Sequence, residues 1–154
     1  MFFIINIFLE RYAAGLLILI VFCAISLFAA IPLAEMHGVK YVFENYLTAS
    51  VGSVLFIWAV YSLAILFSTI FSEKGKASMV ASGILVLMYV LSIISALNND
   101  LINLQYFSFF HYFNGGDLLA NNIYPEHILL ALGGSAMVLT TLSVIYFKRR
   151  DLSV

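Results

Sequence analysis

The order of apolar and polar positions divides this chain into four long uncharged stretches separated by polar connections. Each stretch holds about 20 residues or more, and at roughly 1.5 Å of helical rise per residue that length crosses a hydrocarbon core of roughly 30 Å. The pattern therefore predicts an all-α protein, a polytopic transmembrane helix bundle with four spans. We expect one membrane domain, residues 1–154, with spans at residues 13–35, 48–72, 77–97 and 126–148.

The longest connection, residues 98–125, contains an aromatic run just before the last span. Six of the eight residues from Tyr106 to Phe113 are aromatic, and the turn-forming residues Asn114 to Asp117 follow. We expect an external segment that is either interfacial, as an aromatic anchor, or re-entrant, closing the outer end of a translocation route. On a helix, Tyr106, Phe109, Phe110 and Phe113 would share one side. Candidate gate or anchor residues are Tyr106, Phe109, Phe110, His111, Tyr112, Phe113 and Asp117.

The basic residues predict the orientation of the bundle. With four spans, six Lys and Arg residues fall on the side of the two termini and only Lys40 falls on the other side. Basic residues are enriched in cytoplasmic loops, so both termini and the tail, 148–154, are expected in the cytoplasm of a cell-membrane protein. The main orientation signal is carried by Lys74, Lys76, Lys148, Arg149 and Arg150, with Arg11 in addition.

Small and amphipathic residues inside the spans predict helix contacts. Ala77 with Ala81, and Ser78 with Ser82, are four apart and share a helix face, where small side chains permit close approach. Gly133 and Gly134 offer a second such surface in the last span. Two aromatic residues with polar tips, Trp58 and Tyr61, lie well inside the second span.

Composition supports a membrane protein and argues against several function classes. The chain is 64% hydrophobic and 10% charged, with a mean hydropathy of +1.07, whereas soluble domains are roughly 45–50% apolar and about 25% charged. A net charge of −1 without a basic patch argues against a nucleic-acid partner. An ion-coupled transporter would require an ionisable residue near the middle of a span, and the predicted spans carry none there. Gly75-Lys76 is followed by Ala77, so it is no phosphate-binding motif.

The candidate polar pairs argue weakly for catalysis or metal binding. His111 with Asp117, and Glu35 with His37, each supply two ligands where zinc sites use three or four. We therefore expect no catalytic, cofactor-binding or metal site in this chain. Asp117 is interpreted as the cap of a short helix, and His111 as a residue at the level of the lipid headgroups.

Two motifs resemble the C-terminal part of ABC-2-type permeases of ATP-binding-cassette transporters. In that family a motif of the form Ser-Pro-Phe-x-Tyr-Phe precedes the last span, and this chain has Ser108 to Phe113, with Phe109 in place of the proline. The family often ends on Phe-x-Arg-Arg-Asp-Leu, which matches Phe147 to Leu152. The polar turn from Ser72 to Ala77 occupies a corresponding place between two spans.

The resemblance implies a permease component that is truncated or split, because such permeases have six spans and this chain matches the last four. By resemblance, a separate ATP-binding-cassette ATPase subunit would hydrolyse ATP, and a second permease chain or the missing spans would complete the pathway within the lipid bilayer. The substrate stays open. The alternative is a small four-span scaffold or assembly protein without transport activity.

Overall fold

The computed structural model describes residues 2–38, 42–121 and 127–151. These residues are almost entirely helical and contain no strand, which confirms the predicted all-α class. Four helices are long and apolar enough to cross a membrane. Helices suit this setting because they satisfy every backbone hydrogen bond within one segment. The four long segments are α1 (Phe2–Met36), α2 (Phe43–Ile70), α3 (Lys74–Leu97) and the last span, which combines η2 (Leu129–Gly133) with α6 (Gly134–Asp151).

The first helix is longer than the expected span of residues 13–35. It begins at Phe2, so Glu10 and Arg11 lie inside it rather than before it. Its 35 residues correspond to about 52 Å at the usual helical rise. The helix ends at Met36, and in the turn that follows Gly38 has a positive φ of 66° and its amide donates to the carbonyl of Glu35 at 3.1 Å. A glycine adopts this left-handed conformation without the clash of a Cβ atom.

The second and third spans are joined by a tight turn. The second begins five residues earlier than expected, at Phe43, and ends at Ile70, while the third begins at Lys74. The amide of Phe71 donates to Phe67, and Lys76 forms an ion pair of 3.0 Å with Glu73. Both side chains of this pair are mostly exposed, so it contributes little stability.

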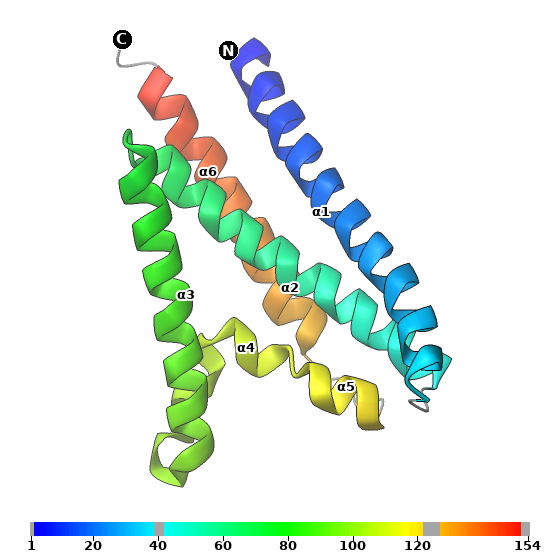
Figure 1. The fold of residues 1–154 in the computed structure, drawn as a ribbon. Coiled ribbons are helices and arrows are strands. Elements are labelled where there is room, and N and C mark those ends of the chain that lie inside the picture. The colour runs from blue at the N-terminus through cyan, green and yellow to red at the C-terminus, as the bar shows by residue number, and fades with distance from the viewer. Residues whose placement is uncertain (1, 39–41, 122–126, 152–154) are drawn as a thin grey trace.

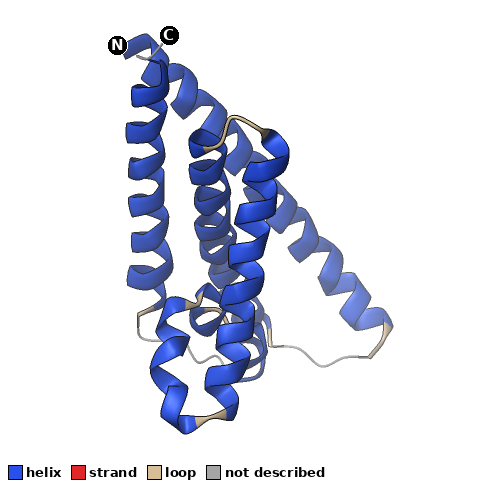
Figure 2. Ribbon diagram, turned by 90° about the vertical axis from the view of Figure 1, so that its left-hand side faces the viewer, coloured by secondary structure: helices blue, strands red, loops and turns tan. Residues whose placement is uncertain are grey.

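Both ends of the chain lie at the same end of the bundle as this turn, as four spans require (Figures 1 and 2). Helices α2 and α6 cross at the centre, α3 lies on one side and α1 on the other (Figure 1). The buried core joins α2 to the last span through Ala59, Leu63, Leu132 and Ala136. Helix α1 packs more loosely, since none of its most apolar window is buried inside the molecule. Most of its apolar surface is therefore available for contact with lipid or with another chain.

The small-residue contacts are confirmed in part. Ala77 and Ala81 are buried, whereas Ser78 and Ser82 on the neighbouring face are exposed. The expectation of close packing at residues 133 and 134 is wrong within the described chain, because a Cβ added at either glycine would meet no atom within 4 Å. These glycines instead lie where the π-helical turn η2 passes into α6.

In its described part, the connection before the last span forms three short helices. They are η1 (Asn99–Phe107), α4 (Phe109–Tyr112) and α5 (Gly115–Asn121). In Figure 1 α4 and α5 run across the bundle, towards the end opposite the termini. The expected first residue of the last span, Glu126, lies outside the described residues.

Candidate functional site

The aromatic run does not form one helix, because Ser108 divides it. Ser108 is completely buried and its hydroxyl oxygen accepts a hydrogen bond of 3.2 Å from the amide of Phe110, which starts α4. Tyr106 belongs to the preceding helix η1 and is 58% exposed. The prediction that Tyr106 shares a helix face with Phe109, Phe110 and Phe113 is therefore wrong. The physical reason is the serine cap, which satisfies an amide of the new helix and turns the chain.

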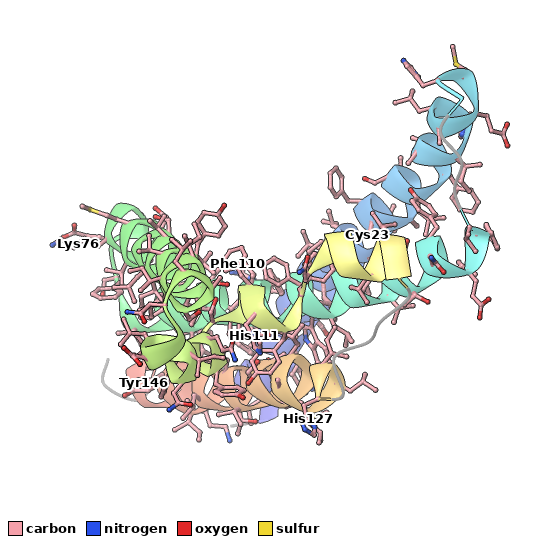
Figure 3. All side chains as sticks on the ribbon, turned by 90° about the horizontal axis from the view of Figure 1, so that it is seen from below. Cys23, Lys76, Phe110, His111, His127 and Tyr146 are labelled. Atoms are coloured by element: carbon pink, nitrogen blue, oxygen red, sulfur yellow. The ribbon has the colours of Figure 1, made fainter. Side chains whose placement is uncertain are left out.

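The residues after this cap insert into the bundle. Phe109 is buried in the core with Ala59 and Leu63 of α2. Phe110 makes edge contacts with Phe56 of α2 and Tyr89 of α3, with 5.2 Å between ring centroids in each pair. Offset and edge contacts of this kind are the favourable geometries for aromatic rings. The segment thus joins α2 to α3 from inside, and Figure 3 shows Phe110 and His111 near the centre of the bundle, seen from the end opposite the termini.

The remaining aromatic residues divide between an outer group and an inner one. The ring of His111 makes edge contacts with Tyr106 and Tyr112, at 5.5 and 5.1 Å, and the Tyr112 hydroxyl donates to the backbone carbonyl of Tyr106 at 3.3 Å. Partial burial lowers the pKa of His111 below its usual value, because desolvation disfavours the charged imidazolium. Phe113 faces the other way and stacks on Phe56 at 5.1 Å.

Asp117 is not the cap of the following helix. Helix α5 begins at Gly115, so Asp117 lies within its first turn, and its side chain lies outside the described residues. The side-chain oxygen of Asn114 accepts a hydrogen bond of 3.2 Å from the amide of Gly116, so Asn114 acts as the cap instead. Leu118 of α5 is completely buried against α2, where Gly52 provides the space for it.

A cavity of about 400 Å³ lies between α1 and α2, and the aromatic segment forms one of its walls. Phe113, Gly115 and Leu119 contribute that wall, and Asn45 of α2 donates to the carbonyl of Leu119 at 3.0 Å, which ties α5 to α2. The opposite walls are apolar apart from side chains of Ser, Tyr and Cys. The hydroxyl groups of Ser50 and Ser53 donate hydrogen bonds to carbonyls of their own helix. The cavity therefore suits an apolar group rather than an ion. Its lining from α1 and α2 comprises Phe22, Cys23, Ser26, Leu27, Ala30, Tyr46, Ala49, Ser50, Ser53 and Ile57.

A second cluster, which the sequence did not predict, joins α1, α2 and α6 through polar tips. We call it the Tyr12 cluster: Tyr12, Trp58, Ser62 and Thr140. The Tyr12 hydroxyl lies 2.8 Å from both Ser62 Oγ and Thr140 Oγ1, and it accepts a hydrogen bond of 2.8 Å from Trp58 Nε1. Ser62 and Thr140 also donate to carbonyls one turn earlier, at 2.8 and 2.7 Å. The available signal was Trp58 well inside an apolar span, since a buried indole N–H needs a partner.

The ionisable residues of the described chain are dispersed. No group of three or more His, Cys, Asp or Glu gathers there as a metal site would require. His37 Nδ1 lies 2.9 Å from the carbonyl of Leu33 and is exposed. Phe8 contacts Phe147 at 5.2 Å, so the turn of α1 with Glu10 and Arg11 lies beside the end of α6 rather than at mid-span.

Of the basic residues in the orientation signal, Lys76 pairs with Glu73 and Lys148 lines a groove between α1 and α6. The side chains of Lys74, Arg149 and Arg150 lie outside the described residues.

Comparison of this chain with protein-family models, curated proteins and solved structures finds no match.

Proposed function

We propose that this protein is a membrane-spanning permease component of an ATP-binding-cassette transporter. The observation that supports this function best is the cavity between α1 and α2, one wall of which is formed by Phe113 and Leu119 of a short, inserted segment. The segment lies outside the four spans and rests on α2 through Phe109, Phe113 and Leu118, so a shift of the segment on α2 would not require a span to unfold. It is suited to open and close one end of a route through the bundle.

The energy for transport comes from a separate ATPase subunit in this proposal. The described spans carry no Asp, Glu, Lys, Arg or His at mid-span for ion coupling, since Glu10 and Arg11 lie near the end of α6. The termini and the α2–α3 turn face the cytoplasm, where the ATPase docks, and the aromatic segment faces outward. A second permease chain or further spans complete the pathway.

The test is transport by the reconstituted assembly. The chain is co-expressed with the products of its neighbouring genes, extracted in mild detergent and examined for a co-purifying ATPase with a phosphate-binding loop. In vesicles, ATP-driven transport should fall several-fold with Phe113→Ala. The matched control is Phe107→Ala, because Phe107 belongs to the same aromatic run but is 72% exposed and does not line the cavity. Repeated purification of the chain alone, without nucleotide-linked activity, contradicts the proposal.

The second candidate is a small membrane scaffold or assembly protein. The loose packing of α1 favours it, because a long apolar helix with so little buried surface can bind another membrane chain. This function predicts a stable complex with a membrane protein and equal activity of that complex with and without ATP. ATP-driven transport in reconstituted vesicles excludes it.

A further inference from the structure

We propose that the groove between α1 and α6 binds an anionic phospholipid, with one acyl chain in the groove and the phosphate against Lys148. The groove has a volume of about 540 Å³, within the range of small-molecule sites. Its sides are mostly apolar, formed by Leu9 of α1 and by Met137, Val144 and Ile145 of α6. Thr141 also lines the groove, and its hydroxyl donates to the carbonyl of Met137 at 2.8 Å. The groove lies near the N-terminal end of α1, whereas the cavity beside the aromatic segment is lined by later residues of that helix.

The floor of the groove is polar in composition but offers no free hydrogen-bond donor. Trp58, Tyr12 and Thr140 line it, and all three belong to the Tyr12 cluster. The indole N–H donates to Tyr12, and the Thr140 hydroxyl has the carbonyl of Ala136 at 2.7 Å. The hydroxyl of Tyr12 lies 2.8 Å from each of two further hydroxyls. Because the donors are used within the protein, a polar solute gains little there and a hydrocarbon chain loses nothing.

One end of the groove carries a positive charge. Lys148 lines it, and no carboxylate pairs with Lys148 among the side chains that the structure describes. The last turn reads Lys148-Arg149-Arg150-Asp151, which has a net charge of +2. Glu10 is exposed, and it is two positions from both Phe8 and Tyr12, which face the bundle, so it points away from the groove. Basic pockets between membrane helices attract anionic headgroups.

The length of the groove matches a lipid that spans from the headgroup level into the hydrocarbon. Thr140 precedes Lys148 by eight residues, or about 12 Å along α6. A phosphate at Lys148 therefore places the acyl chain along the floor at Trp58. A free phosphate would use only the charged end, and an uncharged lipid only the apolar part. This inference stands independently of the proposed transport function.

Trp58 is the only tryptophan of the chain, so its fluorescence reports on the groove directly. The unmodified protein is reconstituted in two preparations of phosphatidylcholine vesicles. One contains phosphatidylglycerol brominated at mid-chain, and the other contains phosphatidylcholine brominated at the same position. The bromine content of the two preparations is equal. Bromine quenches tryptophan on contact. We expect brominated phosphatidylglycerol to compete for the groove about fivefold better than brominated phosphatidylcholine. This factor corresponds to the effect of about one basic residue at a charged membrane surface.

Two variants localise the effect. Lys148→Gln should lower the preference for phosphatidylglycerol to near one, while Lys76→Gln should leave it unchanged, because Lys76 lies on α3 and does not line the groove. Equal quenching by the two lipids, or a preference that survives Lys148→Gln, overturns the proposal. Quenching by neither lipid would show that another helix covers the groove. Loss of the preference on addition of inorganic phosphate at constant ionic strength would assign the charged end to a free anion.

Discussion

The hydroxyl oxygen of Tyr12 on α1 lies 2.8 Å from the hydroxyl oxygen of Thr140 on α6, although 128 residues separate them in the chain. Together with Trp58 and Ser62 of α2, this contact joins three spans at one point. Helix α1 has few other buried contacts. Its position beside the bundle therefore depends strongly on Tyr12.

Replacement of Tyr12 by Phe should destabilise the protein by about 1–2 kcal/mol, because the substitution removes hydrogen bonds between helices and leaves the N–H of Trp58 without its acceptor. Denaturant titration in detergent, followed by the fluorescence of Trp58, measures the change. The emission should also shift to shorter wavelength. Tyr146→Phe is the control, since Tyr146 is 46% exposed on α6. Equal behaviour of the two variants would contradict a role for the cluster.

Gly15→Ala should also weaken the contact between α1 and α2. A Cβ at Gly15 would overlap the hydroxyl oxygen of Tyr61, and it would lie 2.8 Å from the adjacent ring carbon. Because the overlapping atoms are at the tip of the Tyr61 side chain, the ring must shift and lose its hydrogen bond of 3.3 Å to the carbonyl of Tyr12, which costs about 1 kcal/mol. Gly83→Ala is the matched control, because a Cβ there meets no atom within 4 Å and alanine favours the helix. The same denaturant titration compares them, and a Gly15→Ala variant as stable as Gly83→Ala would refute the close approach.

Gly52→Leu should displace α5 from α2. A Cβ at Gly52 already lies 3.1 Å from Leu118 and 3.4 Å from Phe113, so a larger side chain cannot fit. The reporter is Ala49→Cys in a Cys23→Ser background, because Ala49 is buried on α2 one turn before Gly52 and its replacement leaves Leu118 in place. Maleimide labelling of this cysteine should accelerate at least tenfold with Gly52→Leu and stay slow with Gly83→Leu. Unchanged labelling in both variants would show that α5 does not rest on Gly52.

Acidification should loosen the outer part of the aromatic segment. Burial lowers the pKa of His111 below its ordinary value of 6.5, so the folded state binds this proton less tightly than the unfolded state. The stability that depends on a neutral His111 is fully present above pH 6.5. It is lost as the pH falls below that value towards the pKa of His111 in the folded state. The melting temperature should therefore fall more between pH 8 and pH 5 in the unmodified protein than in His111→Gln. An identical fall would show that other groups carry the pH dependence.

The topology predicts opposite labelling of two cysteines in a Cys23→Ser background. Asn103→Cys in η1 should react with an impermeant reagent from outside intact cells, whereas Ser72→Cys in the α2–α3 turn should react only after permeabilisation. The reason is the excess of Lys and Arg at the end of the bundle that holds the termini and this turn. The reverse pattern would overturn the orientation.

Sequence alone determined that four segments are long and apolar enough to cross a membrane, because long uncharged runs have few alternatives in a bilayer. It also predicted a polar turn between the second and third spans, but it placed that turn at Ser72 to Ala77, whereas α3 already begins at Lys74. It also located the aromatic run, but a pattern of aromatic residues does not say whether that run lies on the bundle or within it. The tertiary structure decided this through Ser108, which caps α4, and through Phe110, which contacts Phe56 and Tyr89 from different helices.

The Tyr12 cluster was beyond sequence analysis for the same reason. Its members lie 46, 50 and 128 residues from Tyr12 along the chain. The hydroxyls of Ser62 and Thr140 also donate to carbonyls of their own helices, so their presence in the sequence does not require a partner on another helix. Local patterns determine which segments are helical and which are apolar. Only the packing of those helices decides which polar tips meet, because that choice depends on contacts between distant segments.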